Sequence, residues 1–196
     1  MNMPKMKTAW RAMTLGTMLC LGAPALAQDD PVDVTPKNCN TPIGMTLKGP
    51  LASMVQPRPD YAAYINKHAT ELDLYKLQNW MDKSREVIFE AEYSKTMSKL
   101  QGKLSLANMQ LLIKTFDGLF SKNDNPNKQL IDKEIAADHA HFVFISTYKN
   151  KRSLVMESSY FVGRCIVTTR LQAPLARFSP RQWMSAANEV DVALMK

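Results

Sequence analysis

The sequence predicts an α+β fold, in which a small antiparallel sheet of three or four strands in the C-terminal half packs against helices. Three observations support this expectation. Apolar residues recur every three to four positions before residue 121, β-branched and aromatic residues become frequent from residue 141, and the last segment opens with a well-marked helix start. An irregular proline-rich N-terminal arm and a C-terminal helix complete the expected architecture.

The first 27 residues have the three parts of a cleavable secretory signal. A basic start is followed by ten apolar residues, 13–22, which are too few to cross a bilayer of about 30 Å as a helix. Ala25-Leu26-Ala27 is a small-x-small cleavage site. We therefore expect cleavage after Ala27, a periplasmic location and no transmembrane segment after cleavage.

The net charge argues against nucleic acid as a partner. The formal charge of +7 includes three basic residues of the expected signal, so the remaining chain has 22 basic and 18 acidic residues and a net charge of +4. This excess is mild, and an exported protein does not share a compartment with nucleic acid.

Two cysteines, Cys39 and Cys165, remain after cleavage. In an oxidising compartment an isolated pair is typical of a disulfide. The bridge would stabilise the fold by about 5 kcal/mol in the chain-entropy model. A catalytic thiol is the alternative, but the sequence shows no base and no orienting group for one.

Residues 28–60 contain six of the eleven prolines and little periodicity. Proline lacks a backbone donor and pushes the preceding residue toward extended conformations. We therefore expect a proline-rich extended arm here, fastened to the body through Cys39. Residues 61–196 are expected to form a single α+β domain.

Helical spacing predicts a helix from residue 61 to about Ser84. Residues 86–94 fit either a continued helix or a strand with four residues on one face, namely Val87, Phe89, Ala91 and Tyr93. A further helix is expected to begin after Ser105, whose hydroxyl can cap it, and to end in the polar stretch 121–127.

Three consecutive strands are predicted at His141–Tyr148, Leu154–Phe161 and Arg164–Leu171. Gly163 marks a turn or bulge before the third strand. Alternation places Cys165 on the same face as the apolar residues of this strand, which suits a disulfide that faces the core.

The final helix has the clearest start in the chain. Ser179 is the expected N-cap, Pro180 fits the first helical position, and Gln182 completes a capping box. Phe178 and Trp183 occupy the two positions of a hydrophobic staple. The expected apolar stripe comprises Trp183, Ala187, Val190 and Leu194.

His139 and His141 are candidate metal ligands, because residues two apart on a strand project from the same face. Asp138 or Glu134 could add a carboxylate, and His68 is the remaining histidine. A catalytic metal needs three protein ligands, so the alternative is two polar residues at the entry of a strand.

A second candidate site is a basic patch at one edge of the sheet, which could bind an acidic protein, an anionic polymer or a lipid headgroup. Its members are Lys149, Lys151, Arg152, Arg164 and Arg170. The alternative is that these charges protect the sheet against edge-to-edge aggregation.

No motif in the sequence specifies a reaction or a cofactor. We therefore expect an exported envelope protein that binds another macromolecule, such as an inhibitor, an immunity protein or an assembly factor, without catalysis. The alternative is a metal-dependent or cell-wall-acting periplasmic enzyme that uses His139 and His141.

Overall fold

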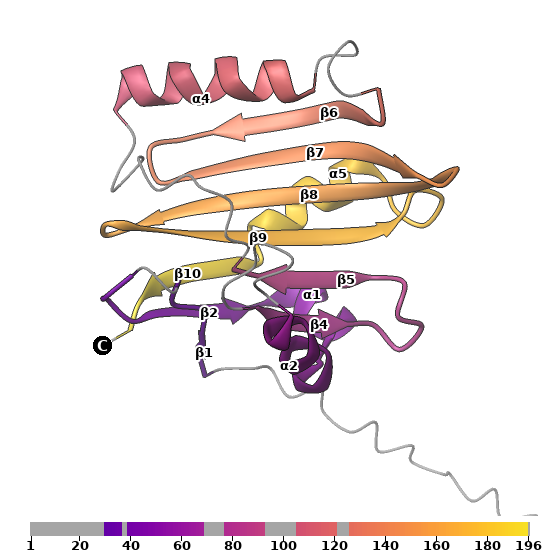
Figure 1. The fold of residues 1–196 in the computed structure, drawn as a ribbon, viewed down its shortest axis with the longest axis horizontal. Helices are drawn as coiled ribbons and strands as arrows, with labels where there is room; N and C mark the ends of the chain where they lie inside the picture. Colours follow the sequence, from indigo (N-terminus) through magenta and orange to yellow (C-terminus); the bar gives the residue numbers. More distant parts are fainter. Residues whose placement is uncertain (1–29, 37–38, 69–76, 93–104, 121–125, 196) are drawn as a thin grey trace, which may run out of the picture.

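The protein is mostly β, with two antiparallel sheets and four short helices in the part of the chain described here (Figure 1). The computed structural model describes residues 30–36, 39–68, 77–92, 105–120 and 126–195. The expected fold with one sheet of three or four strands packed against helices is wrong, since the larger sheet has seven strands and the smaller one three.

The larger sheet has the strand order β3-β4-β5-β9-β8-β7-β6. Its strands are β3 (Gln56–Pro57), β4 (Gln78–Met81), β5 (Ile88–Ala91), β6 (Lys128–Ile135), β7 (His139–Tyr148), β8 (Lys151–Val162) and β9 (Cys165–Pro174). The three predicted strands correspond to β7, β8 and β9, which are longer than expected and pair in sequence order.

Two-residue turns join these three strands. Lys149 and Asn150 connect β7 to β8 with φ values of 47° and 63°, and Tyr148 lies directly opposite Lys151. Two positive φ angles define a type I′ turn, whose twist matches that of the flanking strands. Gly163 begins the turn between β8 and β9 with a φ of 59°, so the turn expected at this glycine is confirmed.

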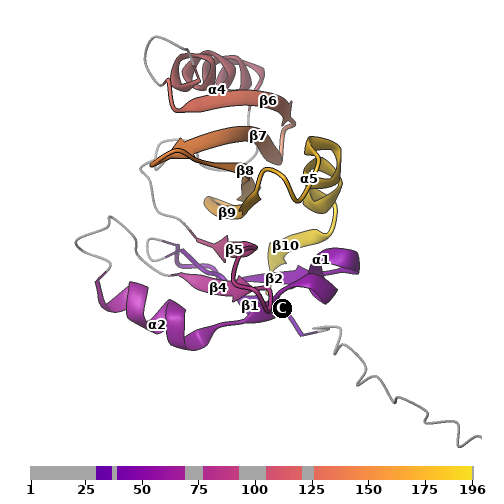
Figure 2. The same cartoon turned by 90° about the vertical axis from the view of Figure 1, so that its right-hand side faces the viewer.

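The smaller sheet packs with α5 (Pro180–Ala187) against one face of the larger sheet (Figure 2). Its strands, in spatial order, are β1 (Val32–Asp33), β2 (Ile43–Leu47) and β10 (Val190–Leu194). The core between the two sheets includes Ile43, Met45, Phe89, Val167, Leu171 and Trp183. A separate apolar cluster covers the opposite face of β7 and β8 and includes Phe142, Phe144 and Val155.

The remaining helices lie at the margins of the molecule. The longest, α4 (Leu106–Leu119), runs along β6, and the Phe120 ring that follows it stacks near Phe142 (Figures 1 and 2). Its expected cap is confirmed, because Asn108 N donates to Ser105 Oγ at 3.2 Å. The others are α1 (Gly49–Met54) and α2 (Pro59–Lys67). No helix among the described residues is long and apolar enough to cross a membrane.

The predicted disulfide is confirmed. Cys39 and Cys165 are bonded with their Cα atoms 5.8 Å apart, and the bridge joins the segment before β2 to the first residue of β9. The neighbouring residues on that face of β9, Val167 and Leu171, are fully buried. The bridge therefore ties the smaller sheet to the larger one.

The expected helix from residue 61 to Ser84 is wrong over its second half. Helix α2 ends at Lys67, and Gln78–Met81 form β4 instead. Residues 86–94 fitted either a helix or a strand, and within them Ile88–Ala91 form the strand β5 with Phe89 and Ala91 fully buried. Tyr93 lies outside the described residues. Pairing with neighbouring strands determines the structure of both segments, and such pairing depends on residues far away in the sequence.

The C-terminal helix starts as predicted but ends early. Both hydrogen bonds of the capping box at Ser179 and Gln182 are present, and the rings of Phe178 and Trp183 lie 4.6 Å apart. However, α5 stops at Ala187, and Val190 and Leu194 belong to β10. Residues 190–192 alternate between apolar and polar side chains as in a strand, and pairing with β2 makes them a strand rather than a continuation of the helix.

The expected irregular arm contains regular structure. Residues 43–47 form β2, the central strand of the smaller sheet, and Ile43 and Met45 are buried in the core. Helices α1 and α2 both have proline in their first turn, where its missing N–H costs no helical hydrogen bond. Two of the six prolines, Pro50 and Pro59, therefore stand at helix starts, and Pro57 belongs to β3.

Candidate binding groove

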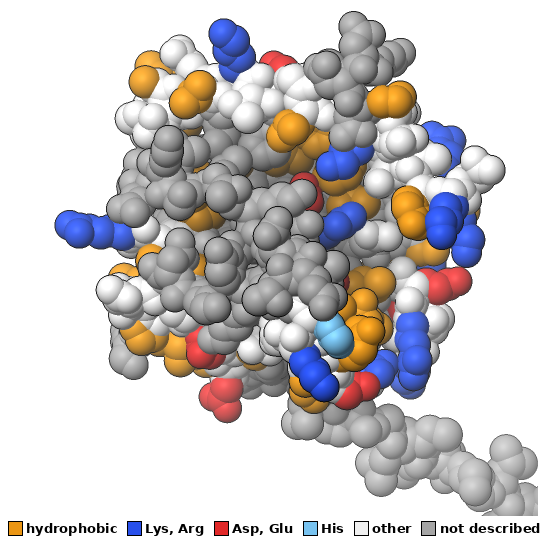
Figure 3. All heavy atoms as spheres, in the orientation of Figure 1, with side chains coloured by type: hydrophobic (Ala, Val, Ile, Leu, Met, Phe, Trp, Pro, Cys, Tyr) orange, Lys and Arg blue, Asp and Glu red, His pale blue; other side chains and the backbone are white. Residues whose placement is uncertain are grey.

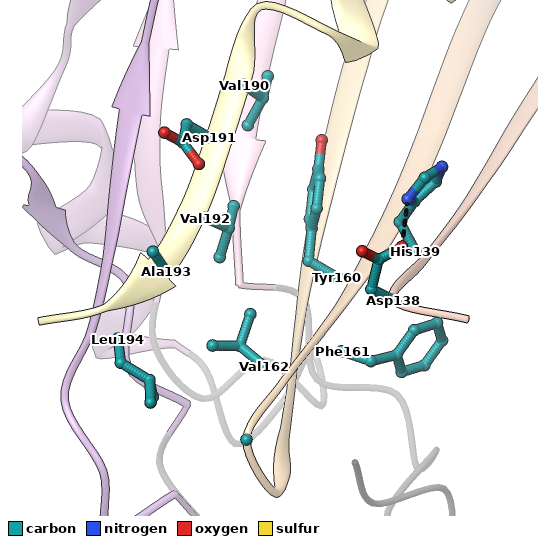
Figure 4. A pocket seen from close by; sticks show the side chains of 11 residues that line it. Asp138, His139, Tyr160, Phe161, Val162, Val190, Asp191, Val192, Ala193 and Leu194 are labelled. Carbon is teal, nitrogen blue, oxygen red and sulfur yellow. Dashed lines mark hydrogen bonds and ion pairs between the residues drawn. The ribbon is translucent and has the colours of Figure 1, made fainter. Parts of the chain in front are cut away.

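A pocket of about 560 Å³ opens between β10 and the ends of β7 and β8 (Figure 4). All five residues of β10 line one wall. The opposite wall consists of Asp138, His139 and the stretch from Tyr160 to Gly163. The pocket therefore separates an edge of the smaller sheet from the larger sheet, and we call it the β10 groove.

One backbone edge of β10 faces this groove. On its other edge, Lys48 N donates to Glu189 O at 2.8 Å and Met195 N donates to Pro42 O at 3.0 Å. Bonded and non-bonded pairs alternate along an antiparallel ladder. Asp191 and Ala193 therefore also direct their N–H and C=O groups toward β2.

The intervening residues Val190, Val192 and Leu194 direct their backbone N–H and C=O groups away from β2. The strand order β1-β2-β10 places no described strand on that side. Val190 and Val192 also point their side chains toward the core between the sheets. A partner that enters the groove thus meets free backbone donors and acceptors of a fixed strand.

The wall opposite β10 carries a histidine between two carboxylates. His139 Nδ1 lies 2.9 Å from Asp138 Oδ1 (Figure 4). His139 Nε2 lies 3.6 Å from Glu134 Oε1. The Asp138 and Glu134 side chains are 63% and 57% exposed, respectively. Of these three residues, Asp138 and His139 line the groove, so this wall presents one carboxylate beside an imidazole that it holds by a hydrogen bond.

His141 lies behind His139 and is buried. The two rings stack with their centroids 4.5 Å apart and their planes 24° apart. Burial, and then the neighbouring His139, lower the pKa of His141 to about 4, although the carboxylates of Glu134 and Asp138 oppose this shift. His141 is therefore neutral at physiological pH and contributes no charge to the groove.

Tyr160 lies on β8 directly opposite His139 and lines the groove. Its ring meets that of His141 edge-on, with the centroids 5.6 Å apart. Burial raises the pKa of the Tyr160 phenol to about 12, while the hydroxyls of Ser158 and Thr169 limit the rise. The phenol therefore stays protonated at any physiological pH.

The two predicted metal ligands come together, because the rings of His139 and His141 stack against each other. A catalytic site would need a third protein ligand beside them. Within the described residues, no group of three or more histidine, cysteine, aspartate or glutamate side chains is arranged to hold a metal ion. Metal binding by His139 and His141 stays a prediction.

The five residues of the predicted basic patch do not form one surface. Lys149, Lys151 and Arg152 lie at the turn between β7 and β8, whereas Arg164 lies in the turn between β8 and β9. These turns flank opposite ends of β8, which has 12 residues. At about 3.3 Å per residue the two ends are roughly 35 Å or more apart.

Arg170 lies in the middle of β9, between two acidic neighbours. It is directly opposite Glu90 of β5 on one side and Glu157 of β8 on the other. Burial raises the pKa of the Glu90 carboxyl, and the charge of Arg170 opposes this rise. Arg170 therefore compensates acidic groups within the sheet, which assigns it a structural role.

Neither the free edge of β10 nor the position of Tyr160 in the groove was predicted from the sequence. The residues of β10 fit a helical stripe with Trp183 and Ala187, and Tyr160 is one of several aromatics on a predicted strand. The alternation of Val190, Val192 and Leu194 was the one available signal for a strand. No protein-family model matches this sequence, and no curated protein has significant sequence similarity to it.

Proposed function

We propose that the protein is a non-catalytic binding protein of the bacterial periplasm, and that its partner lies as an extended segment along the free edge of β10. One observation carries this proposal: all five residues of β10 line an open groove, and three of them direct free backbone groups into it. Extended peptides commonly bind by adding a strand to such an edge.

The groove favours a partner segment of about five residues, the length of β10. Main-chain hydrogen bonds to Val190, Val192 and Leu194 would give affinity that depends little on the partner's sequence. Specificity would come from the opposite wall, where a lysine or arginine of the partner would meet the Asp138 carboxylate. Lys48 already neutralises Asp191 at 3.0 Å on the β10 side.

Export is the second part of the proposal. It is supported by the intramolecular disulfide, which is typical of oxidising compartments, and by the signal-like residues 1–27. Inhibitors, immunity proteins and assembly factors of the envelope are the classes of binding protein that this proposal covers. Intact-mass measurement of the protein recovered from the envelope tests the cleavage after Ala27.

Site-specific photo-crosslinking in intact cells tests the binding site. A photoreactive residue at position 193, on the rim of the groove, should yield one reproducible adduct. The same residue at position 181, an exposed site on α5, should not yield it. Recovery of the same adducts from both positions, or of none from position 193, would contradict the proposal.

A pair of variants tests the strand addition itself. Val192→Pro removes an N–H that points into the groove, and Val192→Ala shortens the same side chain but keeps the N–H. The adduct should be lost with proline and retained with alanine, with both proteins folded by circular dichroism. Equal adduct yields for the two variants would exclude main-chain pairing at β10.

A second candidate is a metal-dependent or cell-wall-acting enzyme that uses His139 and His141. The observation in its favour is the 2.9 Å contact between Asp138 and His139, because a carboxylate that holds an imidazole is a common arrangement in general bases. Elemental analysis and wall-digestion assays of the His139→Ala, His141→Ala protein address it. Stoichiometric metal or hydrolysis that disappears in this variant would favour the enzyme over the binding protein.

A further inference from the structure

The turn between β7 and β8 forms a basic tip that projects beyond the rest of the larger sheet. The paired residues of β9 begin opposite Ser153 of β8, and one further hydrogen bond runs from Leu175 N to Arg152 O. The paired residues of β6 end opposite Ser146 of β7, and one further hydrogen bond runs from Thr147 N to Asn127 O. Residues Tyr148–Lys151 therefore have no described strand beside them except each other. We call residues 148–152 the hairpin tip.

Three of the five residues in the hairpin tip are cations. Lys149, Lys151 and Arg152 are exposed, and in the described structure none of them forms an ion pair. The eight residues from Ser146 to Ser153 contain no acidic side chain. Lysine and arginine side chains gather at the end of the molecule where this turn lies (Figure 3). Among the described residues, the hairpin tip is thus a positive projection without an ion-pair partner.

The cations point in several directions around the tip. Tyr148 and Lys151 are directly opposite each other and share one face of the hairpin, whereas Arg152 lies opposite Thr147 on the other face. Lys149 occupies the first central position of the turn, with a φ of 47°. Glycine and asparagine are usual at such a position, so a lysine stands here although the backbone conformation favours other residue types.

An aromatic ring accompanies the charges. Tyr148 is 71% exposed, the largest exposed fraction among the large apolar and aromatic side chains described. Lys149 Nζ lies 5.3 Å from the centroid of its ring. Tyrosine is enriched at the membrane–water interface, where its ring enters the headgroup layer and its hydroxyl stays hydrated.

We propose that the hairpin tip binds end-on to an anionic phospholipid surface, independently of the β10 groove. Charge complementarity favours anionic headgroups, and a narrow convex tip with charges on both faces suits a fluid headgroup layer better than the groove of a protein partner. Each lysine or arginine near such a surface strengthens binding by roughly fivefold. Three cations together give an effect of about 100-fold at low salt.

Vesicle sedimentation with protein purified from the cell envelope tests this proposal. The probes are vesicles of phosphatidylcholine mixed with phosphatidylglycerol and vesicles of phosphatidylcholine alone. The test variant is Lys149→Gln, Lys151→Gln, Arg152→Gln. The matched control is Lys83→Gln, Lys114→Gln, Arg181→Gln, which removes the same charge from exposed positions elsewhere.

We expect the wild type and the control to bind the mixed vesicles to similar extents and phosphatidylcholine alone weakly. The partition coefficient of the test variant should be about 100-fold lower than that of the wild type. Tyr148→Ala should lose part of the binding. High salt should abolish wild-type binding to the mixed vesicles. Absence of wild-type binding, or equal losses in the test and control variants, would overturn the proposal. The double variant Lys151→Gln, Arg152→Gln leaves the turn residues intact and provides the same test if the triple variant misfolds.

Discussion

Arg177 donates a hydrogen bond from Nη1 to Asp82 Oδ2 at 2.9 Å, across 95 residues of sequence. Asp82 also accepts hydrogen bonds from the Ser84 hydroxyl and from the backbone N–H groups of Glu86 and Val87. This carboxylate therefore holds the turn between β4 and β5 and fastens it to the segment that leads into α5.

Removing the charge of Asp82 should destabilise the protein. Burial alone would raise its pKa, but the hydrogen bonds from Ser84, Val87 and Arg177 outweigh burial and lower the pKa to about 2. Asp82→Asn should lower the free energy of unfolding by about 2 kcal/mol. Urea unfolding at pH 7 measures this change. Glu86→Gln is the control, because the 55% exposed Glu86 contacts the same arginine and should cost well under about 1 kcal/mol.

The buried His141 should make stability depend on pH. Its pKa is about 4 in the folded protein and about 6.5 when unfolded, so the unfolded chain binds the proton more tightly between these values. The free energy of unfolding should therefore rise with pH from about 4 to 6.5, by about 3 kcal/mol from this group. Unfolding curves across this range for the wild type and His141→Gln measure the contribution.

The variant His141→Gln should remove most of the slope between pH 4 and 6.5. His139→Gln should retain most of it, because burial is the main cause of the shift at His141. A slope that is unchanged in His141→Gln would assign the pH dependence to another group. The contribution of Asp82 is separate, since it is lost only as the pH falls below about 3.8 toward 2.

Loss of the disulfide should weaken the whole molecule. The bridge closes a loop with a sequence separation of 126 residues, for which the chain-entropy model gives a stabilisation of about 5 kcal/mol. Because β2 is the central strand of the smaller sheet and its Ile43 and Met45 are buried in the core, we expect Cys39→Ser, Cys165→Ser to shift a single cooperative transition to a lower denaturant concentration. Urea denaturation followed by far-ultraviolet circular dichroism and by tryptophan fluorescence measures the shift of the midpoint. Release of residues 30–47 by protease without any loss of global stability would contradict the prediction.

Proline substitutions along β10 should reveal which backbone edge is free. Ala193→Pro removes an N–H that faces β2, whereas Leu194→Pro removes one that faces the groove. Both side chains are exposed, so the comparison isolates the backbone. We expect Ala193→Pro to be the less stable variant by about 1–3 kcal/mol, because the partner carbonyl in β2 is left unpaired. Equal stabilities would show that the assignment of the free edge is wrong.

The parts of the fold that could be predicted are those with local signatures. Ser179, Gln182 and Phe178 specify a helix start within a few residues, and the β-branched run from 141 to 171 specifies strands with short turns. The disulfide followed from the count of cysteines and the expected compartment. The helix start and the strands are determined by residues within the segment itself, and the disulfide by the oxidation chemistry of a cysteine pair.

The missed strands owe their structure to distant partners. Lys128–Ile135 forms β6 although it is largely polar, because an edge strand needs little burial and is protected by charge. Ile43–Leu47 becomes a strand between prolines because β10, more than 140 residues later in the chain, pairs with it. The candidate groove depends on that same pairing. It could not have been located before β10 was known to be a strand.

The length of β8 has a consequence for how the two proposed surfaces work together. The strand carries the hairpin tip at its first residues and the wall of the β10 groove at its last, so it acts as a rigid spacer of about 30 Å between them. A protein held at a lipid surface by one end would present its groove to partners at a fixed height above the bilayer. Occupancy of one end would not obstruct the other, and anchoring would raise the effective concentration of the groove for partners on the same surface.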